Sequence, residues 1–116
     1  MTSRDRAEKT VREYWVKKIP KRVEKALGSA LHNLYAGPGG GGGMGFKTAV
    51  SILSNWWSDV GSDVWYDVQS GEVLTQEPKS WQEDGEWFEP DWSDYKFFDA
   101  SYSKKLIFGK ELAPYI

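Results

Sequence analysis

The stretch FKTAVSILSNWWSDVG, residues 46–61, decides the fold more than any other part of the chain. Its apolar side chains recur every three or four residues, which is the spacing that gathers them on one face of an α-helix. The stripe comprises Phe46, Ala49, Val50, Leu53, Trp57 and Val60, widened by Ile52 and Trp56. Gly61 follows the stripe and is the kind of residue that ends a helix. We therefore predict a helix that is the central and most buried element of the fold.

A second helix is predicted upstream of the glycine-rich segment, with its first turn at Pro20 and its end just before Gly37. Its apolar residues also recur at helical spacing, and they are Val23, Ala26, Leu27, Ala30, Leu31, Leu34 and Tyr35. Pro20 suits the first turn of this helix, where its missing N–H is not needed. Gly37 suits the position just past the helix end.

A shorter apolar stripe indicates another helix at the start of the chain. It consists of Ala7, Val11, Tyr14 and Trp15. Thr2 or Ser3 is available as its N-cap. Because the residue before a proline avoids the helical region, we expect the two helices to be separated or kinked near Ile19.

A glycine-rich segment, residues 37–45, lies between the second helix and the predicted central helix. Such a segment is typical of a connecting loop. It resembles a phosphate-binding loop in leading into Phe46-Lys47-Thr48, but that motif needs glycine directly before the lysine and a strand before the loop. Here Phe46 separates Gly45 from Lys47, and the preceding element is a predicted helix. The sequence therefore does not predict a nucleotide-hydrolysing site.

After residue 61 the apolar pattern changes to a period of two, which is typical of β-strands. The first predicted hairpin has strands at residues 63–68 and 72–75. The second has strands at residues 81–83 and 86–88 around Asp84-Gly85, a preferred pair for a two-residue turn. We expect the four strands to form one antiparallel sheet, with Trp81 opposite Phe88.

The end of the chain is predicted less fully. Residues 91–99 suit either a short strand or a helical turn. We predict that Ser101 caps a final helix through Tyr102, Leu106 and Ala113, weakened by Gly109.

The expected fold class is therefore α+β. It comprises kinked or paired basic amphipathic helices, a glycine-rich loop, a buried central helix, a small antiparallel sheet of two hairpins and a short C-terminal helix. The 116-residue length favours one domain. Within it we expect a basic helical arm (residues 1–36), a glycine-rich loop (37–45) and an acidic, aromatic-rich α+β region (46–116).

Charge divides the chain more sharply than its net charge of −2 suggests. Residues 1–36 hold nine Lys/Arg against four Asp/Glu, a net +5, whereas residues 44–116 hold six against thirteen, a net −7. Such an asymmetry bears on partners rather than on fold. One interpretation is that the two halves attract each other, either within one molecule or across a dimer. The other is that the basic half binds an anionic partner outside the molecule.

Composition excludes several kinds of site. The chain has no Cys and one His, which excludes disulfides, thiolate zinc sites, iron–sulfur clusters and a histidine-rich metal site. No apolar run is long enough to span a membrane, and the N-terminus lacks the apolar region of a signal peptide. We therefore expect a cytoplasmic protein with no cofactor, no bound metal and no membrane partner.

The aromatic residues give the first functional hypothesis. Fifteen of the eighteen aromatic residues fall in residues 44–116, and alternate residues of a strand point to opposite faces. Either helices cover both faces of the sheet, or an aromatic face is exposed. An exposed aromatic face rimmed by acids is typical of a protein-binding surface. The candidate protein-binding residues are Trp65, Trp81, Trp87, Phe88 and Trp92.

The basic residues give the alternative hypothesis. A cationic ridge across the two N-terminal helices is typical of nucleic-acid binding, although a solvated helix face has the same composition. The candidate nucleic-acid-binding residues are Arg12, Lys17, Lys18, Lys21, Arg22 and Lys25. Carbohydrate binding by exposed Trp is a minor alternative.

Catalytic chemistry is not predicted. The many carboxylates around residues 83–94 match no calcium-loop spacing, and they suit the solvation of aromatic strands. His32 follows Leu31 on a predicted amphipathic helix, with no serine–acid set beside it in sequence. The main hypothesis is therefore a non-catalytic protein-binding module, acting as an assembly subunit, an adaptor or an inhibitor, with a protein partner or self-association.

Overall fold

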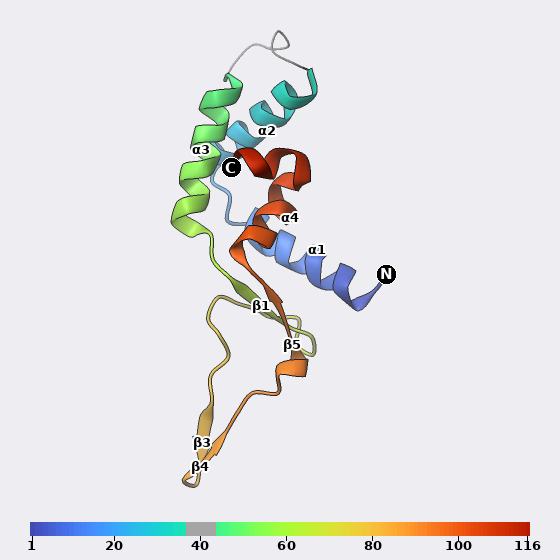
Figure 1. The fold of residues 1–116 in the computed structure, drawn as a ribbon, viewed down its shortest axis with the longest axis vertical. Helices are drawn as coiled ribbons and strands as arrows, with labels where there is room; N and C mark the ends of the chain where they lie inside the picture. Colours follow the sequence, from blue (N-terminus) through green and yellow to red (C-terminus); the bar gives the residue numbers. More distant parts are fainter. Residues whose placement is uncertain (37–43) are drawn as a thin grey trace.

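The structure is a computed structural model that describes residues 1–36 and 44–116 (Figure 1). Most of the predicted glycine-rich loop, residues 37–43, lies outside the described residues. The helices are α1 (Ser3–Val16), α2 (Lys21–Ala36), α3 (Phe46–Val60) and α4 (Ala100–Leu112). Two 3-10 turns are η1 (Trp92–Asp94) and η2 (Ala113–Tyr115). The strands are β1 (Val64–Asp67), β2 (Val73–Leu74), β3 (Trp81–Glu83), β4 (Glu86–Phe88) and β5 (Tyr95–Phe98).

The predicted α+β fold class is confirmed, and so are the helices expected before and after the glycine-rich segment. Helical structure is interrupted between α1 and α2 over residues 17–20, next to Pro20, as predicted. Helix α3 ends at Gly61, as predicted. It buries one face, with Ala49, Leu53 and Trp57 inward, and exposes the other.

A cluster of aromatic rings forms the centre of the core, where α1, α3 and α4 meet. Trp15 and Trp57 pack edge to face with ring centroids 5.0 Å apart, and Phe108 approaches Trp57 at 6.2 Å. Edge-to-face packing is a favoured arrangement of aromatic rings in proteins. Around them, helix α2 packs along α3 through the small buried residues Ala26 and Ala30.

The strands form two separate sheets instead of the predicted single four-stranded one. A three-stranded antiparallel sheet has the order β2-β1-β5, and β3 pairs only with β4. The prediction of one sheet is wrong because β1 takes as its second neighbour β5, a segment about thirty residues later in the chain, while β3 and β4 pair only with each other. The ambiguous residues 91–99 contain both expected elements, η1 followed by β5.

The N-cap of α1 agrees with the prediction, whereas the N-cap of α4 differs from it. Thr2 caps α1, since its side chain accepts a hydrogen bond from the Asp5 N–H while the Asp5 carboxylate accepts one from the Thr2 N–H. Asp99, not Ser101, caps α4: the Asp99 carboxylate accepts from the Tyr102 N–H at 2.7 Å, so the helix starts two residues early. Gly109 interrupts α4 with a φ of 78°.

The molecule is elongated because β3 and β4 stand away from the rest of the chain (Figure 1). Its extents are 66 × 31 × 21 Å and its Cα radius of gyration is 17.8 Å. A compact chain of this length has a radius of gyration of about 13 Å. We refer to residues 75–91, which contain β3, β4 and their connections, as the projecting hairpin.

Candidate protein-interaction surface

The end of the projecting hairpin is a tight two-residue turn. Asp84 and Gly85 have φ angles of 49° and 83°, which is the left-handed pair that this type of turn requires. The turn fixes the register, so Trp81 pairs with Phe88, as predicted, and Gln82 pairs with Trp87. The Trp81 and Phe88 rings stack with centroids 5.8 Å apart and planes inclined by 20°.

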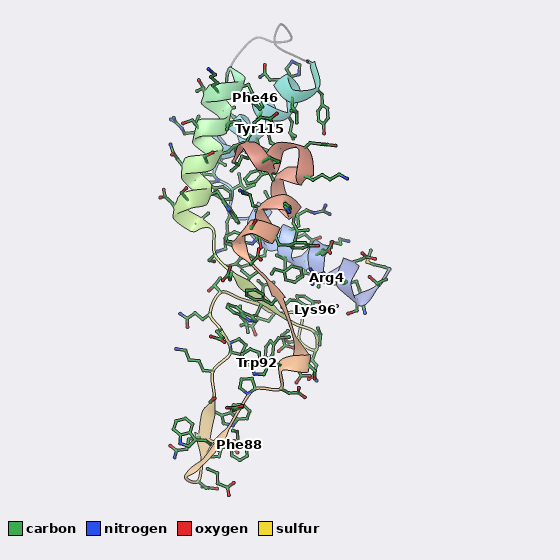
Figure 2. All side chains as sticks on the ribbon, viewed as in Figure 1. Arg4, Phe46, Phe88, Trp92, Lys96 and Tyr115 are labelled. Carbon is green, nitrogen blue, oxygen red and sulfur yellow. The ribbon has the colours of Figure 1, made fainter. Side chains whose placement is uncertain are left out.

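Every residue of β3 and β4 is exposed, including three of the predicted binding residues (Figure 2). Because Trp87 alternates with Phe88 along β4, it lies on the face opposite to the Trp81–Phe88 stack. Its side chain is 70% exposed. The projecting hairpin therefore presents large aromatic groups on both of its faces, and the core of the protein covers neither.

Trp65 and Trp92 lie elsewhere, beside the outward face of the three-stranded sheet. In β1, Trp65 stands opposite Leu74 on one side and Phe97 on the other, and the Trp65 and Phe97 rings are 5.1 Å apart. Tyr95 shares this face by alternation along β5, and its ring contacts that of Trp92 at 6.5 Å. We call these five residues, Trp65, Leu74, Trp92, Tyr95 and Phe97, the outer sheet face.

The outer sheet face remains open because helix α1 covers only the opposite one. Tyr66, Val73 and Phe98 point toward the core, while Phe97 is 49% exposed and Trp92 is 48% exposed. Trp65 itself is half-buried. Sequence reasoning missed Tyr95, Phe97 and Leu74. The available signal was that Tyr95 and Phe97 are alternate residues and so point to the same side of a strand. Which side of the sheet this is becomes known only once the partner strand is known.

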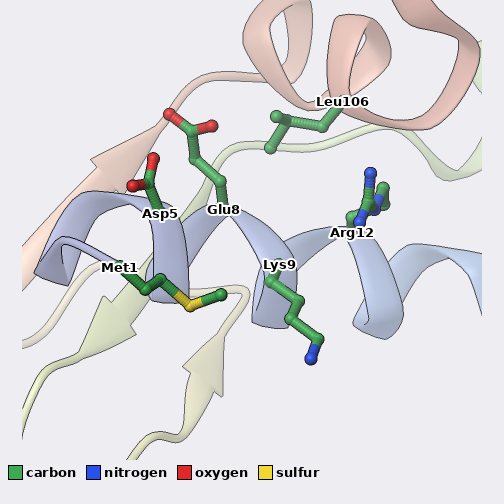
Figure 3. A pocket seen from close by; sticks show the side chains of 6 residues that line it. All are labelled: Met1, Asp5, Glu8, Lys9, Arg12 and Leu106. Carbon is green, nitrogen blue, oxygen red and sulfur yellow. The ribbon is translucent and has the colours of Figure 1, made fainter.

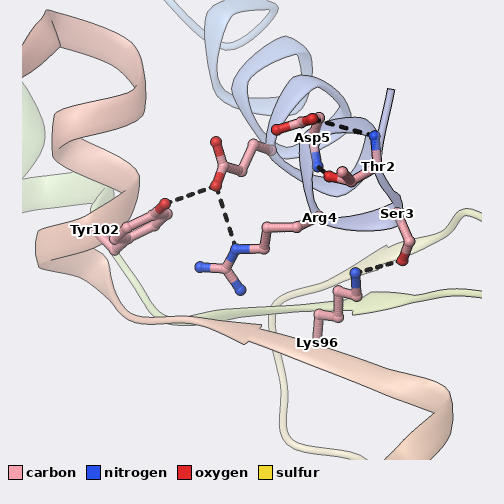
Figure 4. Close-up of polar contacts among 7 residues, drawn as sticks. Thr2, Ser3, Arg4, Asp5, Lys96 and Tyr102 are labelled. Carbon is pink, nitrogen blue, oxygen red and sulfur yellow. Dashed lines mark hydrogen bonds and ion pairs between the residues drawn. The ribbon is translucent and has the colours of Figure 1, made fainter.

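Helix α1 is fixed on the inner side of the sheet by a polar cluster (Figure 4). The Arg4 guanidinium lies over the Phe98 ring at 4.5 Å and the Tyr102 ring at 5.0 Å. The Glu8 carboxylate accepts hydrogen bonds from Arg4 Nε at 3.2 Å and from the Tyr102 hydroxyl at 2.7 Å. These contacts tie α1 to β5 and α4, so this cluster is structural.

Acidic side chains surround the exposed aromatic residues. The projecting hairpin holds six Asp/Glu and one Lys, a net −5. At its base, hydrogen bonds from the Ser93 hydroxyl and the Ser93 N–H lower the pKa of Asp91. Next to the outer sheet face, the N–H groups of Ser70 and Gln69 lower the pKa of Asp67. Both carboxylates are therefore charged at neutral pH.

The six candidate nucleic-acid-binding residues are all exposed, but they do not converge on one pocket. They extend from α1 across the break into α2. Among residues 1–36 and 44–116, the single ion pair joins Arg4 and Glu8, so none of the six is neutralised by a carboxylate of its own molecule. Lys18 Nζ lies 4.8 Å from the centre of the Tyr14 ring.

Among the hollows of this basic region, three lie beside α1. The hollow in Figure 3, about 200 Å³, mixes Arg12 and Lys9 with Asp5 and Glu8. A second, about 310 Å³, is lined by Arg12, Glu13, Val16 and Lys17. A third, about 360 Å³, is lined by Thr10, Glu13, Tyr14, Lys17, Lys18 and Val73. The second and third share Glu13 and Lys17, so they adjoin each other.

Other kinds of site were sought in the described parts of the chain. No group of three or more His, Asp or Glu side chains there is arranged to hold a metal ion. None of the helices in those parts combines the length and the hydropathy needed to cross a membrane. Two buried polar atoms, Trp15 Nε1 and Ser103 Oγ, have no hydrogen-bond partner, but both belong to the packed core.

Comparison of the chain with protein-family models, with curated proteins and with solved structures finds no match.

Proposed function

We propose that this protein is a non-catalytic protein-binding module whose contact surface is the projecting hairpin, continued by the outer sheet face. The observation that carries this proposal is the 70% exposure of Trp87 in a hairpin none of whose strand residues is buried. Large aromatic residues are the usual anchors of protein interfaces, and folding alone gives no reason to display them in this way.

The partner is expected to be cationic. The projecting hairpin has a net charge of −5, so a basic surface is attracted to it and an acidic one is repelled. Lys and Arg side chains also stack favourably on exposed indole rings. The open edges of β3 and β4 offer unpaired backbone groups to an extended segment, which favours a partner that binds as a strand.

The alternative proposal, nucleic-acid binding, rests on the six exposed cations that have no ion pair among the described residues. These cations form no single groove, and the exposed aromatic residues that could stack on bases lie in the acidic part of the molecule. The protein-binding proposal accounts for more of the exposed surface. Carbohydrate binding by Trp81, Trp87 and Trp92 would account for the indoles but not for the surrounding acids.

A peptide array tests the main proposal. Fluorescently labelled full-length chain is applied to extended peptides of graded positive charge with interspersed apolar residues, and to oligonucleotides and oligosaccharides as competitors. We expect binding to the basic peptides, weakened by salt, and at least tenfold weaker in Trp87→Ala. Tyr35→Ala is the matched control, because Tyr35 is an equally exposed aromatic residue away from this surface.

Equal binding by Trp87→Ala and wild type would contradict the proposal. Binding to oligonucleotides that survives Trp87→Ala but is lost on reversing the charges of Lys18, Lys21 and Arg22 would support the nucleic-acid alternative instead.

A further inference from the structure

The two faces of the projecting hairpin differ in chemistry, because the pairing of β3 with β4 sorts their side chains. One face, which we call the stacked face, holds an aromatic pair and an acidic pair of opposite residues: Trp81 with Phe88, and Glu83 with Glu86. They share this face because alternate residues of a strand point the same way. The other face, which we call the Trp87 face, holds Gln82 and Trp87. Within the two strands, all the negative charge therefore lies on the stacked face.

The chain does not neutralise the negative charge of the stacked face. Glu83 and Glu86 stand directly opposite each other, and like charges in that position destabilise a pair of strands. Among residues 1–36 and 44–116, the single ion pair joins Arg4 and Glu8, so no Lys or Arg there forms an ion pair with either carboxylate of the stacked face. A cation supplied by a partner relieves this repulsion, which makes the stacked face selective for positive charge.

The aromatic stack leaves one side of the Phe88 ring free at the edge of β4. Trp81 lies against the side that faces β3, with the two ring planes inclined by 20°. The other side therefore faces the edge of β4, where no strand of the described chain is paired, and Phe88 is 37% exposed (Figure 2). A guanidinium group suits this position, because it is flat, stacks on aromatic rings and binds a carboxylate through two hydrogen bonds.

The Trp87 face also favours the edge of β4 over that of β3. Here β4 carries Trp87, which is 70% exposed, whereas β3 carries Gln82. An apolar side chain on a strand beside β4 has an indole ring as its direct neighbour, and beside β3 it has an amide. A strand beside β4 therefore meets Glu86 and Phe88 on one face and Trp87 on the other.

We propose that the partner is an extended segment in which arginine alternates with an apolar residue, paired along β4. The arginine opposite Phe88 stacks on the free side of that ring and reaches the Glu86 carboxylate diagonally, a separation that long side chains span. The next residue is apolar and packs on Trp87. A second copy of the hairpin is not this partner, because two hairpins of net charge −5 repel each other. This inference rests on the proposed function, since it names the side-chain pattern that the same surface recognises.

The test is the fluorescence anisotropy of three labelled peptides titrated with full-length chain. The first peptide alternates arginine with valine, the second alternates arginine with serine, and the third alternates lysine with valine. Trp87→Ala should weaken binding of the arginine–valine peptide about tenfold but change binding of the arginine–serine peptide much less, because only valine packs on the indole. The lysine–valine peptide should bind several-fold more weakly than the arginine–valine peptide, since an ammonium group neither stacks nor binds a carboxylate through a planar fork.

A pair of matched variants identifies the edge at which the peptide binds. Glu86→Gln and Glu83→Gln make the same chemical change on the same face, and each removes the like-charge pair. Glu86→Gln should weaken binding of the arginine–valine peptide about fivefold, and Glu83→Gln should weaken it less, because Glu83 lies one strand further from a peptide beside β4. Both positions are exposed, and circular dichroism checks that each variant is folded.

Three results each overturn the inference. They are an equal loss of the two arginine peptides in Trp87→Ala, equal binding of the lysine–valine and arginine–valine peptides, and an effect of Glu83→Gln as large as that of Glu86→Gln. If any of them occurs while Trp87→Ala still weakens binding of basic peptides, the proposed function stands and only the recognised pattern or edge is wrong. If Trp87→Ala weakens binding of no peptide, both proposals fail.

Discussion

Trp15 and Trp57 occupy the place where three helices meet, and they are 2% and 9% exposed. Trp87 is chemically identical but is 70% exposed. The difference lies in the neighbours: Trp57 packs against Trp15 and Phe108, whereas Trp87 stands opposite only Gln82 across a two-stranded hairpin. The tryptophans of the packed helices therefore stabilise the fold, whereas Trp87 in the projecting hairpin is accessible to solvent.

This contrast predicts opposite results for two substitutions of the same kind. Trp57→Ala should lower the free energy of unfolding by about 3–5 kcal/mol, because it removes a large buried ring and leaves a cavity. Trp87→Ala should change it by no more than about 0.5 kcal/mol, since no packing is lost. Denaturant titration followed by circular dichroism measures both, and similar losses in the two variants would contradict the assignment of Trp87 to an exposed surface.

Carboxylates at turns and helix starts make stability depend on pH. Hydrogen bonds from the backbone lower the pKa values of Asp5 and Asp67, from Thr2 in the first case and from Ser70 and Gln69 in the second. A carboxylate whose pKa is lower in the folded state stabilises that state above its unfolded pKa, and this contribution is lost as pH falls through the folded pKa.

We therefore expect the wild-type free energy of unfolding to decrease between about pH 5 and about pH 2. Asp67→Asn keeps an oxygen that accepts the N–H bonds of Ser70 and Gln69 but cannot ionise. Its stability should decrease less steeply over the same range, as measured by urea titration at each pH. An unchanged slope would mean that Asp67 does not contribute to the acid sensitivity.

At the scale of elements, glycines have two distinct roles in the helices. Gly109 interrupts α4 with a φ of 78°, a conformation that a residue with a Cβ adopts only under strain. Gly28 lies inside α2, and a Cβ built on it meets nothing within 4 Å. Gly109 is therefore required by the backbone, whereas Gly28 is not.

Gly109→Ala should lower the free energy of unfolding by about 1 kcal/mol or more, because alanine is strained at positive φ. Gly28→Ala is the matched control and should raise it by about 0.5–1 kcal/mol, since alanine favours the helix and finds space. Thermal and chemical unfolding measure both changes. Stabilisation by Gly109→Ala would show that α4 continues through this position.

Local pattern predicted the helices and the second hairpin, because those elements are determined by neighbouring residues. The stripe through Ala7, Val11 and Trp15 is buried, and Trp81 pairs with Phe88. The pairing of β1 with β5 depends on residues far apart in the chain. The alternation of apolar residues within a strand does not specify which other strand pairs with it. For the same reason, Trp65 could be identified as a candidate but its neighbours Phe97 and Tyr95 could not.

At the scale of the whole molecule, the projecting hairpin is an appendage to a folded body. Its strand residues are all exposed, and an isolated two-stranded hairpin is at best marginally stable in water. The Trp81–Phe88 stack supplies roughly 0.5–1.5 kcal/mol of local support. No residue of the projecting hairpin belongs to the hydrophobic core or packs against it.

Replacing residues 79–90 with a short Gly-Ser linker should therefore leave the helical circular-dichroism signal intact and change the melting temperature by only a few degrees. The radius of gyration of the monomer, measured by small-angle X-ray scattering at high salt, should fall from 17.8 Å toward about 13 Å. An unfolded or strongly destabilised product would contradict the separation of the hairpin from the body.

The complete exposure of β3 and β4 has a consequence for how this protein can change over evolutionary time. Substitutions at these exposed positions remove no buried contact, so the two strands can change in sequence at little risk to folding. We expect descendants of this chain to keep Trp15, Trp57 and Phe108 and to diverge fastest between residues 75 and 91.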